Sequence, residues 1–358
     1  MILSLIIFWF NVFILGYFIL LDGFYSFLMG ISIFSTLRHL GRLRLGRDDE
    51  MFKDSTVPPV SVLVPAFNEE NVIVQNIHGL LSLNYPHYEI IIINDGSTDH
   101  TLSKIIKAFH LKPIDLIYRP IIPTNSVKSF YINPKFPKLI LVDKTKGGKA
   151  DSLNVGINLA RSPYFCSIDA DTLLEKSALL RLVRPILEHP TTTIASGGIV
   201  RIVNGCEVKH GAVTKVLLSK NILPRLQVIE YLRSFLFGRT GMSFLSSLMI
   251  ISGTFSLFHK KSVQDVGGYN RDTVSEDMEI VVHLHRDFKK RKMPYRIVFV
   301  SDPVCWTEAP STLSMLAKQR RRWHKGLAES LSLHFKMMFN PKYGAIGLIG
   351  MGVRQIYG

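Results

Sequence analysis

Apolar and polar positions divide the chain into a long uncharged start and a region where short apolar runs alternate with mixed segments. From Ile2 to Phe34 the only charged residue is Asp22, and this stretch exceeds the roughly 20 residues that span a bilayer. It lacks the basic start and the small-residue cleavage site of a secretory signal. We therefore expect residues 1–36 to form a transmembrane anchor rather than a buried core helix. The anchor is predicted to be one long span, or a span that breaks near Asp22 into an interfacial segment.

Beyond the anchor, apolar runs with the length of buried strands alternate with segments of helical periodicity. The predicted strands are 60–65, 89–94, 138–142, 164–168 and 193–200, and the predicted helices are 68–81, 99–109, 150–159 and 177–187. Strands that alternate with helices of about ten residues indicate parallel pairing in an α/β sheet. The proline-rich stretch 120–137 is predicted to be a surface loop.

Two later regions leave their relation to the membrane open. Residues 222–258 are apolar and rich in hydroxyl groups, which fits either a helix plus a buried strand or an element that lies on the bilayer. Tyr343 to Gly358 form an apolar, glycine-rich run that is too short to span. We expect 336–358 to be interfacial or a truncated membrane helix, and we favour a chain that is a fragment.

The formal net charge of +15 favours nucleic acid, anionic lipid or a phosphorylated substrate as a partner. Basic residues follow the anchor at once, in a predicted juxtamembrane linker over 37–57 (Arg38, His39, Arg42, Arg44 and Arg47). Such a cluster suits membrane lipid, and the positive-inside rule places the following residues in the cytoplasm. Aromatic residues are not interleaved with the basic runs as in a nucleic-acid module, so nucleic acid is not an expected partner. Three widely spaced cysteines indicate neither a disulfide framework nor a zinc site.

Acidic residues follow two of the predicted strands. Asp95 comes after 89–94, and Asp169 and Asp171 come after 164–168. Parallel strands bring their carboxyl ends to one edge of a sheet, where α/β proteins bind ligands. The Asp-x-Asp pair points two carboxylates to one side, and such a pair can hold a hard divalent cation that also binds phosphates. The alternatives are an ordinary turn at Asp95 and a helix cap at Asp171.

Three further motifs are weaker when each is taken alone. The run from Lys146 to Asn154 offers glycine N–H groups and two ammonium groups near a helix start, which suits phosphate. Ser275-Glu276-Asp277 follows no predicted strand, and Gln319-Arg320-Arg321-Arg322-Trp323 also fits a solvated basic helix face. The histidines show no metal-ligand spacing.

In order and spacing, these motifs together resemble the inverting glycosyltransferases of family 2. The resemblance covers roughly residues 57 to 330 and is strongest to the membrane-embedded branch of poly-N-acetylglucosamine, hyaluronan, chitin-oligosaccharide and cellulose synthases. It implies a GT-A fold over 58–335, in which a Rossmann-like nucleotide-binding half joins an acceptor-binding half on the cytoplasmic side of the cell membrane.

The resemblance also implies roles for individual residues. Asp277 matches the catalytic base, and Asp171 matches the ligand of Mg²⁺ or Mn²⁺. The positions that match nucleotide and diphosphate contacts are Ala66, Glu70, Asp95, Lys149 and Asp169. The positions that match contacts to the diphosphate and the acceptor are Gln319, Arg322 and Trp323, and those near the acceptor sugar are Ser252, Gly253, Thr254 and Glu276.

The implied reaction moves a sugar from a UDP-sugar to a growing polysaccharide, with N-acetylglucosamine or glucose as the expected unit. Transfer of one sugar to a lipid acceptor is an alternative. Polymer-secreting relatives carry several membrane helices after Gln-x-x-Arg-Trp, whereas this sequence has at most the start of one. Asp169-Ala170-Asp171-Thr172 also fits the nucleophile motif of haloacid-dehalogenase-type phosphohydrolases, but Lys176 is too close to serve as their lysine. A non-catalytic sugar-nucleotide sensor would leave the joint presence of base and metal motifs unexplained.

Overall fold

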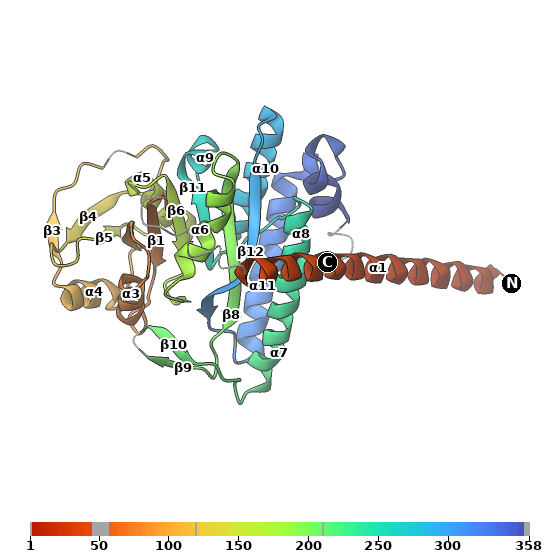
Figure 1. Ribbon diagram of the computed structural model, residues 1–358, viewed down its shortest axis with the longest axis horizontal. Helices are drawn as coiled ribbons and strands as arrows, with labels where there is room; N and C mark the ends of the chain where they lie inside the picture. The colour runs from red at the N-terminus through yellow and green to blue at the C-terminus, as the bar shows by residue number, and fades with distance from the viewer. Residues whose placement is uncertain (1, 45–56, 119, 210, 354–358) are drawn as a thin grey trace.

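The fold is a mixed α/β sheet with helices on its faces and one long helix that extends beyond the rest of the molecule (Figure 1). The computed structural model describes residues 2–44, 57–118, 120–209 and 211–353. The long helix is α1 (Ile2–Arg44). A separate hairpin is formed by β9 (Glu207–Lys209) and β10 (Ala212–Lys215).

The large sheet has ten strands in the order β3-β4-β5-β2-β1-β6-β11-β8-β12-β7. Its strands are β1 (Val60–Ala66), β2 (Tyr88–Asn94), β3 (Lys112–Ile114), β4 (Val127–Ile132), β5 (Leu139–Lys144), β6 (Tyr164–Ile168), β7 (Leu173–Leu174), β8 (Thr193–Ile202), β11 (Phe255–His259) and β12 (Arg296–Thr307). The shorter helices are α3 (Ile73–Leu81), α4 (Thr101–Phe109), α5 (Lys149–Leu159), α6 (Ala178–Glu188), α7 (Ile222–Leu232), η1 (Arg233–Arg239), α8 (Thr240–Phe244), α9 (Lys260–Asp265), α10 (Glu276–Arg291), α11 (Leu313–Leu333), η2 (Phe335–Met337), η3 (Pro341–Tyr343) and η4 (Ile346–Val353).

Four neighbouring strands, β5-β2-β1-β6, pair in parallel. Ile90 to Ile93 in β2 are fully buried, as expected of parallel strands that are covered on both faces. Helix α5 packs on β1 and β2. The predicted α/β fold is therefore confirmed, and the five predicted strands are all present with small changes at their ends.

The second half of the sheet is less regular than the alternation of strands and helices suggested. β11 runs antiparallel to both β6 and β8, while β12 runs parallel to β8. The prediction of a structureless loop over 120–137 was wrong in its middle, where β4 forms an antiparallel ribbon with β3 and β5. Prolines flank this strand, and Val127 to Ile132 lacks a regular alternation of apolar and polar residues that would have indicated it.

The helix predicted over 68–81 begins only at Ile73. Asn68 has a positive φ of 59°, and its side-chain oxygen accepts the N–H of Thr98 at 2.8 Å. The N–H groups of Glu69 and Glu70 donate to Thr101 and Asp99. Because these groups bind the start of α4, the two glutamates lie ahead of the helix rather than in its first turn.

Helix α1 continues through Asp22 without a break. It is the candidate membrane span: its apolar stretch covers Ile2–Arg38, and the mean hydropathy of its most apolar window is 2.4. Its second half packs on η1 and α8, where Leu28 is buried and the Ser32 hydroxyl donates to the Phe237 carbonyl at 2.8 Å. The basic linker predicted over 37–57 lies mostly outside the described residues. The boundary between anchor and linker stays a prediction.

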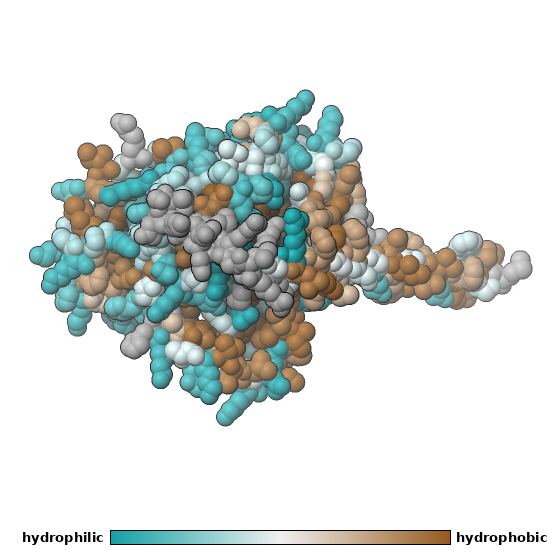
Figure 2. Space-filling model, viewed as in Figure 1, coloured by the Kyte–Doolittle hydropathy of each residue, from teal (hydrophilic) through white to brown (hydrophobic). Residues whose placement is uncertain are grey.

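Residues 222–258 form α7, η1, α8 and β11, so the alternative of a helix followed by a buried strand is confirmed. Ile222, Leu226 and Ile229 on α7 are each more than half exposed, and Figure 2 shows apolar surface over this helix and along the projecting part of α1. At the C-terminal end, Ile346 and Met351 of η4 are buried against Met249, Val282 and Met337.

Candidate active site

The carboxyl ends of β1, β2, β5 and β6 meet at one edge of the sheet because these strands run parallel. Ala66 ends β1, Asp95 follows β2, Lys144 ends β5 and Asp169 follows β6. Ala66 is buried, and its carbonyl accepts the N–H of Asp95 at 2.9 Å. The strands thus gather several of the predicted site residues where open α/β sheets bind ligands.

Asp95 is engaged by its own chain at this edge and is only 4% exposed. Its Oδ1 accepts hydrogen bonds from Lys144 Nζ at 2.6 Å and from the Gly147 N–H at 2.8 Å, and its Oδ2 accepts the Gly148 N–H at 2.8 Å. Gly148 has a φ of 88°, which favours glycine. The carboxylate therefore fixes the loop that leads into α5, and its predicted contact with uridine stays a prediction.

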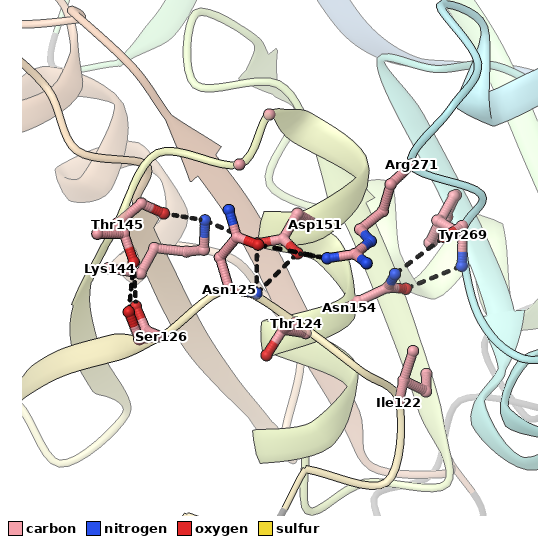
Figure 3. Close-up of polar contacts among 12 residues, drawn as sticks. Ile122, Thr124, Asn125, Ser126, Lys144, Thr145, Asp151, Asn154, Tyr269 and Arg271 are labelled. Carbon is pink, nitrogen blue, oxygen red and sulfur yellow. Dashed lines mark hydrogen bonds and ion pairs between the residues drawn. The ribbon is translucent and has the colours of Figure 1, made fainter.

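A buried ion network surrounds Lys144 (Figure 3). The side chain of Lys144 is fully buried and lies 2.8 Å from Asp151, which is also fully buried. Asp151 further accepts the N–H of Asn125 at 3.0 Å and the Arg271 guanidinium at 3.1 Å. Burial opposes ionisation of Asp151, but the hydrogen bonds from Lys144 and Asn125 lower its pKa. The network therefore ties the segment before Ser275 to the nucleotide half.

Lys149, at the start of α5, connects three of the sequence motifs. Its Nζ lies 2.5 Å from Asp169 and 3.3 Å from Glu276, and it donates to the Gly253 carbonyl at 3.1 Å. Burial opposes its charge, but Asp169, Glu276 and Asp277 together raise the pKa of Lys149 well above its ordinary value. The ammonium group is therefore charged and central to the site.

The two carboxylates of Asp-x-Asp repel each other, and both repel the nearby carboxylate of Glu69. Burial and the charge of Asp169 raise the pKa of Asp171. Burial, then Asp171, Asp169 and Asp99, raise the pKa of Glu69 to about 7. Groups that resist ionisation in this way fit a bound cation, which would relieve the repulsion. Among the described residues, no three His, Cys, Asp or Glu side chains form a ready ligand set, so further ligands would have to come from a bound substrate.

Asp277 lies in the first turn of α10. Burial and the neighbouring Glu276 raise its pKa to about 6, against the opposing effect of Lys149. Its Oδ1 accepts the N–H of Met278 at 2.9 Å. A methyl group built on Gly253 would come within 2.5 Å of Asp277 Oδ2, so this glycine allows the carboxylate to lie against the acceptor segment. A half-buried carboxylate with a raised pKa is typical of a general base.

The predicted acceptor segment runs directly into β11. The Thr254 carbonyl accepts the N–H of Asp169 at 3.4 Å, and the Ser252 hydroxyl accepts the N–H of Thr254 at 3.3 Å. Ser252 is buried, whereas Gly253 and Thr254 are half-buried. The segment therefore lies beside both Asp-x-Asp and the start of α10.

The Gln-x-x-Arg-Trp motif lies on α11, which contacts α10 closely. A methyl group on Gly326 would lie 1.8 Å from the Ser275 hydroxyl oxygen, and Glu329 accepts the N–H of Val274 at 2.8 Å. Arg320 pairs with Glu230 of α7 at 2.5 Å, and its guanidinium lies 4.4 Å from the ring centre of Trp323.

The other two residues of the motif differ in exposure. Arg322 is exposed, whereas the amide oxygen of Gln319 is buried without a hydrogen-bond partner among the described residues. The helix that carries this motif packs on α10, which carries Asp277. Contact of the motif with a diphosphate stays a prediction.

Two positions of the candidate site escaped the sequence analysis. Lys144 looks like an ordinary strand-end lysine, and only the three-dimensional pairing shows its two carboxylate partners. Glu69 was interpreted as part of a helix, although its neighbour Glu70 was selected. In the structure Glu70 pairs with Lys104 at 3.3 Å, whereas Glu69 is the glutamate whose pKa responds to Asp-x-Asp.

Comparison with known proteins identifies the family. The family described as "Glycosyltransferase like family 2" matches residues 58–326. The chain belongs to glycosyltransferase family 2. Poly-beta-1,6-N-acetyl-D-glucosamine synthase of Staphylococcus epidermidis is 30% identical over 282 residues, which are 78% of this chain and 57% of that protein. The same-named enzyme of Staphylococcus aureus strain MSSA476 is 31% identical over 280 residues, which are 77% of this chain and 56% of that protein. The chain thus spans little more than half the length of these curated relatives.

The fold of this family 2 chain also occurs among solved structures. A mannosyltransferase from Pyrobaculum calidifontis, in complex with GDP-Man and Mn2+, matches with a TM-score of 0.57 and 20% identity, covering 90% of this chain and 82% of that one. The expected GT-A architecture is confirmed. The family match favours glycosyl transfer over the phosphohydrolase alternative that Asp169-Ala170-Asp171-Thr172 had left open.

Proposed function

We propose that the protein is a membrane-bound inverting glycosyltransferase that extends a polysaccharide from a UDP-sugar. The observation that carries this proposal is the position of Lys149, whose ammonium group contacts both Asp169 of the Asp-x-Asp motif and Glu276 beside Asp277. The Asp-x-Asp motif and the residue beside the candidate base thus share one cation, which also acts on the pKa of Asp277. A sensor that only bound nucleotide would have no use for a base with a raised pKa.

Asp277 is the proposed base in a single in-line displacement. Its carboxylate removes the proton from the acceptor hydroxyl while that oxygen attacks the anomeric carbon, and UDP leaves from the opposite face. The raised pKa of about 6 keeps Asp277 ionised at neutral pH yet makes it a stronger base than an ordinary aspartate. Lys149 is well placed to turn from Asp169 toward the departing diphosphate.

A divalent metal ion, Mg²⁺ or Mn²⁺, fits the acidic residues. Asp171 would be its direct ligand, and the raised pKa values of Asp171 and Glu69 support a cation there. When bound, the ion neutralises charge on the leaving diphosphate. Arg322 on α11 is proposed to add a bidentate contact to phosphate that a lysine could not reproduce.

The names of the relatives suggest the donor, the product and the location. Both relatives described above are poly-beta-1,6-N-acetyl-D-glucosamine synthases, so we propose UDP-N-acetylglucosamine as donor and a carbohydrate chain as acceptor. The candidate span in α1 supports attachment to the cell membrane. The basic residues that follow this span in the sequence support a catalytic domain on the cytoplasmic side.

UDP release by membranes that carry this chain tests the proposal. The assay offers a panel of UDP-sugars with Mn²⁺ or Mg²⁺ and compares wild type, Asp277→Asn and the matched control Asp272→Asn, an exposed aspartate nearby. We expect release with UDP-N-acetylglucosamine in wild type and control, and at least a hundredfold less in Asp277→Asn with UDP binding retained. Full activity of Asp277→Asn would contradict the assignment of the base. The length of the product distinguishes polymer synthesis from transfer of one sugar to a lipid.

A further inference from the structure

A cavity of about 630 Å³ lies away from the active site, between the second half of α1 and the catalytic domain. Its wall includes the last charged residue of the apolar span and side chains from α6, α10 and the first part of β12. Four of the lining side chains are permanent cations, each from a different element: Arg38, Arg184, Lys289 and Arg296.

These cations are positioned by the fold in different ways. Arg184 is 11% exposed and forms ion pairs with Asp302 at 3.5 Å and Glu188 at 3.8 Å, so its guanidinium has a fixed place in the wall. In the part of the chain that the structure describes, no carboxylate forms an ion pair with Lys289 or Arg296. Among the described lining residues Glu188 is the only carboxylate, and it pairs with Arg184. The charges of Lys289 and Arg296 therefore leave the wall of the cavity net positive.

One side of the cavity is the uncovered edge of the large sheet. β12 pairs with β7 only at Cys305 and Trp306, so its first residues have no strand on their outer side among the described elements. The N–H of Phe299 is instead bound by the Ser243 hydroxyl of α8 at 2.9 Å. The wall thus combines backbone polar groups with cations, which is a suitable environment for an anion.

The rim of the cavity is apolar. Phe34 of α1 is 60% exposed and Phe244 of α8 is 58% exposed, and both line the cavity. Phe34 lies one helical turn before Arg38, where the candidate membrane span ends. A ligand with a phosphate group and an apolar chain would match both the cationic wall and this rim.

We propose that this cavity binds a phosphate-bearing anion. Guanidinium and ammonium groups are the side chains that bind phosphate most strongly, and basic pockets beside membrane helices bind anionic headgroups. An anionic lipid headgroup and a soluble phosphate compound share this chemistry. The site is separate from the proposed catalytic residues, so the proposal does not depend on the reaction.

Native mass spectrometry of the purified chain tests the site. The protein is exchanged into detergent micelles that contain equal amounts of phosphatidylglycerol and phosphatidylcholine, and the retained lipids are counted. We expect wild type to retain phosphatidylglycerol preferentially. The double variant Lys289→Gln/Arg296→Gln should retain about thirtyfold less, because each basic residue contributes roughly fivefold to headgroup binding.

The matched control is Lys107→Gln/Lys112→Gln, which removes the same charge from exposed positions in the nucleotide half. A second variant, Lys289→Arg/Arg296→Lys, keeps both charges and should retain the lipid, which separates charge from folding. Loss of bound phosphatidylglycerol on addition of inorganic pyrophosphate would identify a soluble phosphate as the ligand type. Persistence of the lipid would identify a headgroup. Equal retention by the Gln double variant and its control, or no binding of either probe by wild type, would overturn the proposal.

Discussion

Substitution of Gly326 by alanine tests the coupling between α11, which carries Gln-x-x-Arg-Trp, and α10, which carries Asp277. The added methyl group would lie 1.8 Å from the Ser275 hydroxyl oxygen and 2.4 Å from Ser275 Cβ. The hydroxyl can rotate away, but the Cβ atom is fixed to the backbone. Since ordinary contact begins near 3.4 Å, one helix must move by about 1.0 Å.

A displacement of this size affects both stability and rate. Overpacking of this kind costs about 1–3 kcal/mol of unfolding free energy, and a misplacement of about 1 Å near reacting groups costs roughly a hundredfold in rate. We expect Gly326→Ala to lower kcat for UDP release by about ten- to a hundredfold. The KM for the donor should change less than kcat, because the clash displaces α10, which carries Asp277, whereas Asp95 binds the loop at Gly147 and Gly148.

The assay compares kcat, KM and the thermal unfolding temperature of three variants. Gly238→Ala is the control, since the nearest atom to its added methyl group lies 4.0 Å away. Ser275→Gly in the Gly326→Ala background removes both clashing side-chain atoms and should restore most of the rate. Ser275 forms no side-chain cap bond to α10, so its loss alone should be mild. Wild-type kcat in Gly326→Ala, or failure of the double variant to recover, would refute a steric coupling between the helices.

Four further outcomes follow from the site. Because Asp277 must be ionised to act as base and its pKa is about 6, kcat should rise with pH through about 6 and then level off; a rate that is flat from pH 5 to 8 would exclude it. Lys144→Met should lower the unfolding free energy by about 3–5 kcal/mol in denaturant titrations, since it removes the buried cation that Asp95 and Asp151 share and leaves Asp151 only Arg271. Gly253→Ala should lower kcat but spare UDP affinity in calorimetry, because its methyl group would meet Asp277 Oδ2 at 2.5 Å. Chelation of divalent cations should abolish UDP release, and Asp171→Asn should raise the Mn²⁺ concentration needed for half-maximal release.

The parallel strands β5, β2, β1 and β6 followed from the sequence pattern, because each is a mainly apolar run with a helical segment later in the chain. The β-branched run from Ile90 to Ile93 favours a buried strand, and a carboxylate directly after a parallel strand lies at the carboxyl edge of the sheet. The second half could not be predicted in the same way. β11 runs antiparallel between β6 and β8, and no local pattern records the direction in which a strand enters a sheet.

The site residues show the same difference between what local motifs predict and what tertiary packing decides. Asp169 and Asp171 were predicted from a local motif, and their neighbours came from a resemblance to a family. The partnership of Lys149 with Glu276 joins residues 127 positions apart in the printed sequence, and the burial of Lys144 depends on three separate segments. Such contacts arise from tertiary packing, which single-sequence patterns do not contain.

The contact between Ser32 and Phe237 has a consequence for how the protein is made. The two residues are 205 positions apart, so α1 leaves the ribosome long before η1 and α8 exist. At about 5–20 residues per second, the apolar flank of α1 around Leu28 waits roughly 10–40 s for its partner. During that interval η1 and α8 cannot cover the flank, so the surface that they bury in the folded protein stays exposed to other apolar partners. Synthesis is therefore the stage at which this flank of α1 is longest without the partner that buries Leu28 in the folded protein.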